Sequence, residues 1–250
     1  MKVVFLCRDG LVARYVAHEV HAEHPLEAVV VESGRDARRR KMKRTLRKTP
    51  WWRMPLLAAD LAALAVYGRR WKRELRGRLE GHPASHGYPE GVPRYDVDDA
   101  NEPASVERLR SLESDVLLVL GTAILGSEVL GLPRDAALNI HGGIVPAYRN
   151  VHSEAWAVLN REPHEVGTSI LHLDEGIDSG AVALQRRVEA DDDPGLFELR
   201  WRNVELAAAL AREALRLQSQ GTLPREPQGD ADAGFYPTPG ARELWRLWRG

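Results

Sequence analysis

The sequence has a single cysteine and no long uninterrupted apolar run among its 250 residues. Cys7 lies in the apolar run VVFLC, where packing is the ordinary role of a cysteine, and one cysteine cannot form an intramolecular disulfide. Nothing therefore requires an oxidising compartment. The first apolar run is short and is followed at once by Arg8 and Asp9, so we expect no signal peptide and a cytoplasmic protein.

Two enzyme motifs are also missing. The segment after the first apolar run, CRDGLVARYV, lacks the G-x-G-x-x-G of dinucleotide-binding sites. G-x-S-x-G, the motif of many serine hydrolases, is absent as well. The nine histidines form no recognisable zinc motif with the lone cysteine, so we expect no metal.

Charge is balanced overall and uneven along the chain. The formal net charge is -1, yet residues 35–82 contain sixteen Lys and Arg and only four acidic residues. The remainder of the chain is therefore clearly acidic. We call residues 35–82 the basic insertion.

Hydrophobic patterns predict an α/β protein. Short apolar runs rich in β-branched residues alternate with segments of helical period, which is typical of a Rossmann-like, mostly parallel sheet flanked by helices. We expect one domain over residues 1–220, interrupted by the basic insertion, and a C-terminal extension over 221–250. The expected strands are 2–7, 26–32, 115–121, 136–140, 166–173 and 181–189, the last two paired around the turn DEGIDSG (174–180).

The basic insertion leaves three interpretations open. Its centre, MPLLAADLAALAVYG (54–68), contains Asp60 and is shorter than the roughly 20 residues of a membrane span. Basic runs and Trp51, Trp52 and Trp71 flank this centre, so the insertion is either a solvated basic helix covering the domain or a helical hairpin on an anionic membrane surface. The third interpretation is that the insertion binds nucleic acid, although no recognised nucleic-acid module accompanies its basic residues.

The stretch LNIHGGIVPAYRN (138–150) places two polar side chains at the end of a predicted strand. Asn139 and His141 are two residues apart and so share one face. Ligands of parallel sheets bind beyond such carboxyl ends. An Asn and a His that occur without other polar residues are ordinarily buried in the core with hydrogen-bond partners. Here a third polar residue, Asp178, lies in a turn framed by Gly176 and Gly180. Amide, imidazole and carboxylate together suit acyl transfer to an amine.

NIHGGIVPAYRN followed by GTSILHLDEGIDSG resembles the catalytic signature of the 10-formyltetrahydrofolate-dependent formyltransferases. This superfamily includes glycinamide ribonucleotide transformylase, methionyl-tRNA formyltransferase and the sugar N-formyltransferases. Its pattern is an N-x-H strand end, a Pro-containing loop and an Asp in an x-D-x-G turn, which Asn139, His141 and Asp178 match. The resemblance extends from about Asp115 to Glu189.

The resemblance implies a formyltransferase with a donor cleft and a catalytic trio. His141 and Asn139 would hold the oxyanion, while Asp178 would orient His141, directly or through water, and help remove the proton of the attacking amine. The donor, 10-formyltetrahydrofolate, would lie along GTAIL and the DEGIDSG turn. The residues implied to contact it are Gly121, Thr122, Ala123, Ile124, Leu125, Asp174, Glu175, Gly176 and Ile177.

The acceptor is expected to be a primary amine of a small molecule, with a nucleotide- or lipid-linked amino sugar as the first choice. One alternative is formylation of an amino acid or hydrazine-like amine. Another is that the protein is a non-catalytic folate or nucleotide-sugar binding module. We expect tRNA not to be the acceptor, because too few residues follow position 190 for the C-terminal barrel of the methionyl-tRNA enzymes. Asn150 replaces the Gly of the YRG found in many sugar-formylating relatives, which puts the turn of this loop in doubt. The expected acceptor-site residues are Tyr148, Arg149, His152 and Glu154.

Overall fold

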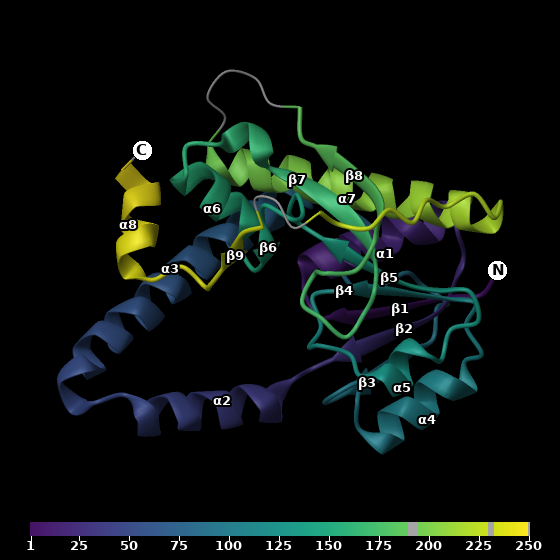
Figure 1. Ribbon diagram of the computed structural model, residues 1–250, viewed down its shortest axis with the longest axis horizontal. Coiled ribbons are helices and arrows are strands. Elements are labelled where there is room, and N and C mark those ends of the chain that lie inside the picture. The colour runs from purple at the N-terminus through teal and green to yellow at the C-terminus, as the bar shows by residue number, and fades with distance from the viewer. Residues whose placement is uncertain (190–194, 230–232, 250) are drawn as a thin grey trace.

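A seven-stranded sheet forms the centre of the computed structural model, which describes residues 1–189, 195–229 and 233–249 (Figure 1). The strand order is β3-β2-β1-β4-β5-β7-β8, in which β7 runs antiparallel to both its neighbours, β5 and β8, and the other neighbouring strands pair in parallel. The predicted Rossmann-like, mostly parallel sheet is confirmed. The strands are β1 (Val3–Arg8), β2 (Leu26–Glu32), β3 (Arg94–Val97), β4 (Val116–Leu120), β5 (Ala136–His141), β7 (Gly167–His172) and β8 (Val182–Arg187).

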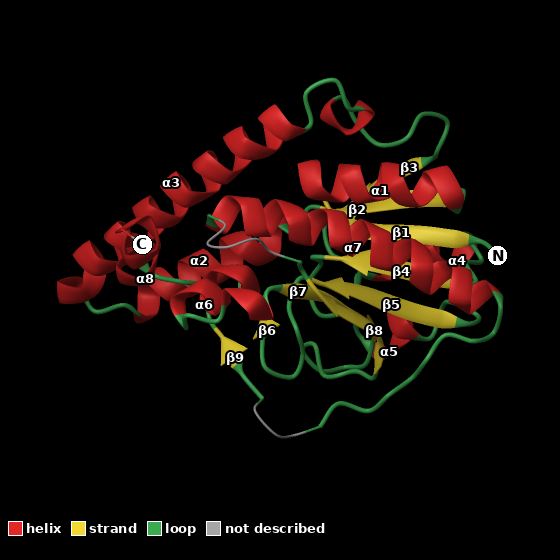
Figure 2. Ribbon diagram, turned by 90° about the horizontal axis from the view of Figure 1, so that it is seen from above, coloured by secondary structure: helices red, strands yellow, loops and turns green. Residues whose placement is uncertain are grey.

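Helices cover both faces of the sheet, which is why its central strands are apolar on both sides (Figures 1 and 2). On one face, Phe5 and Leu118 belong to the core beneath α1 (Leu11–Glu23) and α7 (Leu196–Ser219). On the other face, Leu6 packs with residues of α4 (Pro103–Ser111) and α5 (Ser127–Leu130). The two cores hold the central strands in place. The polar residues at the carboxyl ends of these strands therefore lie together at one edge of the sheet.

The chain after α7 runs back to the sheet and then forms a second, two-stranded sheet. Glu226 forms an isolated bridge with Val182 of β8. Further on, β9 (Phe235–Tyr236) pairs with β6 (Arg149–Asn150), directly before α6 (Ser153–Leu159). The segment expected to be an extension is therefore attached to the loops at the carboxyl edge of the sheet.

The basic insertion forms a helical hairpin, composed of α2 (Arg35–Lys48), η1 (Trp51–Arg53) and α3 (Met54–Arg78). Its second helix returns to the domain, where Tyr67, Trp71 and Leu75 are buried. The C-terminal helix α8 (Ala241–Arg249) packs on α3. None of the described helices is long and apolar enough to cross a membrane. Two further short helices, η2 (Pro83–Ser85) and η3 (Pro163–Glu165), lie in connections.

Cys7 is fully buried in β1 beneath α1. Burial raises the pKa of its thiol to about 12, an effect only partly offset by the hydrogen bond with the Tyr88 hydroxyl, whose oxygen lies 3.4 Å from Sγ. Since the thiolate is the reactive form, this cysteine is chemically inert in the folded protein. The structure agrees with a packing role for Cys7.

We predict that Cys7 resists alkylation by iodoacetamide at pH 8 in the native protein and reacts completely in 8 M urea. The thiol remains protonated below its raised pKa and is shielded by the core. Mass spectrometry after quenched labelling measures the reaction of this single thiol. Rapid stoichiometric labelling of the folded protein would contradict the burial.

Candidate active site

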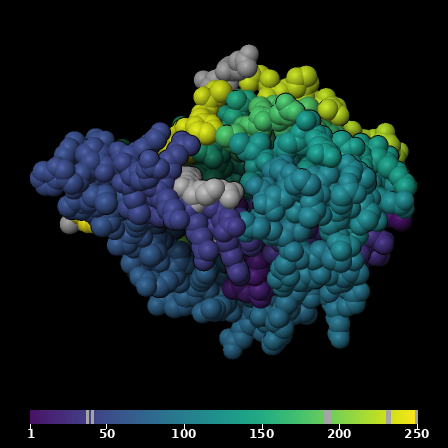
Figure 3. Space-filling model, turned by 90° about the horizontal axis from the view of Figure 1, so that it is seen from below, coloured from purple at the N-terminus to yellow at the C-terminus, as the bar shows by residue number. Residues whose placement is uncertain are grey.

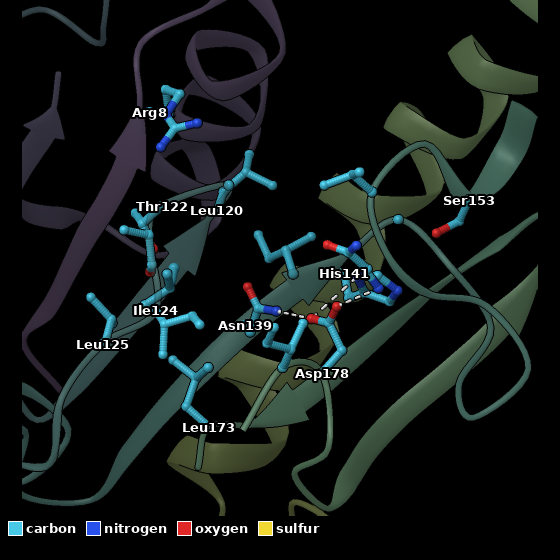
Figure 4. A pocket seen from close by; sticks show the side chains of 18 of the residues that line it. Arg8, Leu120, Thr122, Ile124, Leu125, Asn139, His141, Ser153, Leu173 and Asp178 are labelled. Carbon is cyan, nitrogen blue, oxygen red and sulfur yellow. Dashed lines mark hydrogen bonds and ion pairs between the residues drawn. The ribbon is translucent and has the colours of Figure 1, made fainter. Parts of the chain in front are cut away.

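A cavity of about 670 Å³ opens where the carboxyl ends of β1, β4 and β5 meet (Figure 4). This is the edge at which ligands of parallel sheets bind, and the volume is in the range of small-molecule sites, about 300 to 1,000 Å³. Its walls come from the loop after β4, the end of β5, the loop before α6, the β7–β8 loop and Arg200 of α7.

The three predicted catalytic residues lie in mutual contact at this cavity. Asn139 Nδ2 donates a hydrogen bond to Asp178 Oδ1 over 3.2 Å. His141 Nδ1 lies 3.4 Å from the same oxygen. The other oxygen, Oδ2, accepts the backbone N–H of Asn150 at 2.8 Å. Figure 4 shows the carboxylate between the amide and the imidazole.

The partners of His141 determine where its protons lie. Nε2 is 2.7 Å from the carbonyl oxygen of Tyr148. A carbonyl only accepts, so Nε2 carries a hydrogen, which assigns the tautomer from its partner. Nδ1 then faces a carboxylate, and that contact is attractive only when a proton lies between the two groups. His141 and Asp178 thus form a pair that can hold and pass one proton.

Asp178 is positioned by unusual backbone geometry. Its φ is +50°, in the left-handed region that non-glycine residues adopt rarely and often at functional sites. Gly180 comes so close to the His172 carbonyl that a Cβ would collide with it. Asp174 fixes the start of the turn by accepting the Gly176 N–H and the Ser179 hydroxyl at 3.0 and 2.9 Å.

Gln228, from the C-terminal segment, links this turn to the loop after β5. Its Nε2 donates to the carbonyls of Asp178 and Gly180 at 2.9 and 2.7 Å. Its Oε1 accepts both Nε and Nη2 of Arg149 at 3.2 and 2.7 Å. The C-terminal segment therefore helps to hold the turn that carries the carboxylate.

The loop that contains Asn150 forms a left-handed turn although it has no glycine at this position. It adopts φ +78°, a conformation that asparagine tolerates better than other non-glycine residues. Its side chain donates to the Tyr236 carbonyl at 2.8 Å, which stabilises the turn from β9. The left-handed turn is thus formed without glycine, and its N–H reaches Asp178.

Glu32 holds the loop that follows β4. Its carboxylate is buried at the end of β2 and accepts the N–H groups of Ala100 and Ala123 at 3.1 and 2.8 Å. Arg8 Nη2 lies 3.6 Å away and neutralises the buried charge. Asn101 fixes the other side of the loop by donating to the Ile124 carbonyl at 3.0 Å. The loop thus presents a rigid wall to the cavity.

The predicted donor residues lie along the cavity, with one exception. The apolar side chains Leu120, Ile124, Leu125, Leu173 and Ile177 line it and suit a flat ring system. Glu175 is exposed and is the one predicted donor residue that does not line the cavity. The other predicted donor residues that line it are Gly121, Thr122, Ala123, Asp174 and Gly176.

His152 and Glu154 line the opposite part of the cavity together with Arg200. Arg200 Nε is 4.0 Å from Glu154 Oε1, and its Nη1 donates to the Tyr67 hydroxyl at 2.9 Å. Burial, followed by the nearby Arg200 charge, lowers the pKa of His152, and Glu154 opposes this effect. His152 Nδ1 is buried without a hydrogen-bond partner among the described residues. This part of the cavity therefore offers cationic and unpaired polar groups.

Two predicted acceptor residues point elsewhere. The Tyr148 ring is buried, stacks on Tyr236 and donates its hydroxyl to Glu162, so only its backbone serves the site. The Arg149 guanidinium is engaged by Gln228 and does not line the cavity. The structure therefore places neither side chain in the expected acceptor pocket: the Tyr148 ring packs on Tyr236, and the Arg149 guanidinium lies against Gln228.

Arg8, Glu32, Arg200 and Gln228 were missed by the sequence reasoning. Arg8 and Glu32 carried a signal, since each ends an apolar strand at the edge where ligands bind. Arg200 and Gln228 carried none, because each lies far along the chain from the strands it reaches. No described group of three or more His, Cys, Asp or Glu is arranged to hold a metal ion.

The family model described as "Formyl transferase" matches residues 82–213, more than half of the chain. The match begins at the last residue of the basic insertion and contains all three predicted catalytic residues. Methionyl-tRNA formyltransferase of Clostridioides difficile is 29% identical over 171 residues, which are 64% of this chain and 55% of that protein. The chain spans about half the length of the curated relatives it matches.

Solved structures share the fold at low sequence identity. Glycinamide ribonucleotide transformylase 1 of Symbiobacterium toebii is 18% identical with a TM-score of 0.57, covering 91% of this chain and 93% of that one. The N-formyltransferase of Helicobacter canadensis, solved with folinic acid and dTDP-3-aminofucose, is 13% identical with a TM-score of 0.57. It covers 94% of this chain and 70% of that one.

We predict that Gln228→Leu loosens the turn at residues 174–180. The substitution removes the donor of the Asp178 and Gly180 carbonyls, which costs about 1 to 3 kcal/mol of unfolding free energy where the carbonyls stay buried. Hydrogen exchange of this turn should accelerate markedly, as measured by mass spectrometry. Gln220→Leu, at the exposed end of α7, is the matched control and should leave the turn unchanged. Equal exchange in both variants would refute the role of Gln228.

Proposed function

This chain belongs to the formyl transferase family, and we propose on that basis that it transfers a formyl group from 10-formyltetrahydrofolate to a primary amine of a small molecule. The observation that carries this proposal is the contact of Asn139 and His141 with one carboxylate, Asp178, at the wall of the cavity. An amide and a proton-holding pair are the groups that formyl transfer to an amine needs.

The donor fits the part of the cavity beside the loop after β4. Apolar side chains there suit the faces of a pterin ring, while backbone groups of residues 121–125 suit its polar edge. The fold of this chain is shared with a protein that was solved with folinic acid. The formyl carbon would then lie beside Asn139, between the donor and the opposite part of the cavity.

Asn139 and the His141–Asp178 pair divide the chemistry. The acceptor nitrogen bonds to the formyl carbon, the bond from that carbon to the folate nitrogen breaks, and one proton passes from the acceptor to the folate. Asn139 would stabilise the oxyanion with its second N–H, since the first is held by Asp178. Nδ1 of His141 faces Asp178, because Tyr148 occupies Nε2. The pair would give the proton that it shares to the leaving folate nitrogen and take up the proton that the amine loses, so that it ends as it began.

An amino sugar linked to a phosphate carrier is our preferred acceptor. Arg8 and Arg200 line the cavity as cations, and a nucleotide-linked sugar carries phosphates that pair well with guanidinium groups. The Helicobacter canadensis N-formyltransferase of the same fold was solved with dTDP-3-aminofucose.

We predict that Asn139→Ala, His141→Ala and Asp178→Asn each lower kcat by about 10² to 10⁴, the range of general acid-base and oxyanion contributions. Circular dichroism and thermal unfolding verify that each variant is folded. His164→Ala, at an exposed histidine of η3, is the control and should retain full activity. Wild-type turnover in His141→Ala would overturn the mechanism.

Turnover on a panel of amines tests the acceptor. We expect tetrahydrofolate release with dTDP- or UDP-linked amino sugars, followed spectroscopically, and little with glycinamide ribonucleotide or methionyl-tRNA. Preferred turnover of methionyl-tRNA would overturn the amino-sugar assignment and leave formyl transfer intact. Tight binding of folinic acid without turnover of any amine would instead indicate a binding module.

A further inference from the structure

Large apolar side chains are exposed at the tip of the helical hairpin. Trp51 and Trp52 in η1 are 85% and 61% exposed, and Leu56 at the start of α3 is 60% exposed. Figure 3 shows the hairpin projecting from one side of the molecule. A contiguous apolar patch of this kind marks an interaction site.

The first half of α3 is also apolar and exposes further aliphatic side chains. Between Met54 and Val66 the sole charged residue is Asp60, and its Oδ1 accepts the Ala241 N–H at the start of α8 over 2.7 Å. The charge is therefore used within the protein and is not displayed with the apolar residues. α8 lies along α3 and adds Trp245 and Trp248, both exposed. Met54, Leu61 and Val66 are also exposed on α3.

Cations flank the apolar tip on both sides. The sequence of α2 contains nine Lys and Arg and one acidic residue, Asp36. On the last turns of α3, five more cations are exposed, and Arg70 lies over the Trp248 ring at 5.8 Å. The five are Arg69, Arg70, Lys72, Arg73 and Arg76. This surface is complementary to a negatively charged partner.

The helix α2 gains little stability from packing against the rest of the protein. No residue of α2 whose side chain is described is buried, so none of these side chains stabilises the helix by packing in the core. Like charges three and four residues apart repel one another, and isolated helices of 14 residues are marginal in water. Neutralisation by an anionic surface would remove the repulsion and favour the helix.

We propose that the hairpin Arg35–Arg78, together with α8, binds the surface of an anionic lipid bilayer. A bilayer accounts for both halves of the surface: tryptophan and aliphatic side chains enter the interface, and the flanking cations meet anionic headgroups. Nucleic acid would match the cations and leave Leu56, Leu61 and Val66 without partners. The lipid surface is therefore the occupant that the observations favour.

The membrane surface and the cavity share α3. Tyr67, one residue after the apolar half, accepts a hydrogen bond from Arg200, and its ring meets that of His152 at a centroid distance of 5.9 Å. Trp71, one turn on, packs beneath the Arg200 guanidinium at 4.6 Å. Binding of the hairpin would thus hold the acceptor part of the cavity close to the lipid headgroups. The membrane proposal does not depend on the identity of the acceptor.

Vesicle flotation of the full chain tests the proposal. We expect co-flotation with vesicles of phosphatidylcholine and phosphatidylglycerol at low salt, much weaker co-flotation at high salt, and none with phosphatidylcholine alone. Binding should also shift the tryptophan emission to the blue and increase helicity by circular dichroism.

Two variants separate the apolar and cationic contributions. Trp51→Ser/Trp52→Ser and Lys43→Glu/Arg44→Glu/Arg47→Glu should each weaken vesicle binding by more than about tenfold. The control, Arg161→Glu/Arg216→Glu/Arg225→Glu, makes the same charge change at exposed positions outside the hairpin and should retain binding.

Three outcomes would overturn the proposal. The first is absence of co-flotation with anionic vesicles at low salt. The second is equal loss of binding in the control, which would show attraction by net charge alone. The third is tighter binding of duplex DNA or RNA than of anionic vesicles, with the two tryptophans dispensable.

Unchanged thermal unfolding of the variants shows that any loss of binding is not caused by misfolding.

Discussion

The carboxylate of Asp178 is the contact on which the site depends. It accepts hydrogen bonds from the Asn139 side chain and the Asn150 backbone and faces His141 Nδ1. Because the Tyr148 carbonyl fixes the hydrogen on Nε2, the carboxylate and Nδ1 must share a proton to attract each other. One charge in the β7–β8 loop thereby orients the amide and the imidazole of β5 and the loop that follows this strand.

Holding that carboxylate in place involves much of the C-terminal half. Asp178 adopts a left-handed backbone conformation, which persists only when its surroundings enforce it. Gln228 supplies part of this support through two carbonyls of the turn, and β9 supplies more by fixing Asn150. The segment after α7 is thus part of the site architecture, although it lies outside the range matched by the family model.

The sheet was predictable because its strands are buried on both faces and appear as apolar runs between helical patterns. Asn139, His141 and Asp178 were predictable because two alternate on one strand and the third lies between glycines. The directions of the Tyr148 and Arg149 side chains could not be predicted, because their partners Tyr236 and Gln228 lie far along the chain from them. Arg200 and Gln228 were missed for the same reason: their contacts span about 50 to 130 residues, and no local pattern records such pairings.

Nitrogen NMR of the His141 imidazole in the folded protein at neutral pH detects the proton shared with Asp178 directly. We expect a hydrogen on Nε2 and a hydrogen-bonded Nδ1 whose resonance moves when Asp178 is replaced by asparagine. A bare Nε2, or an Nδ1 resonance that ignores the loss of the Asp178 charge, would contradict this expectation.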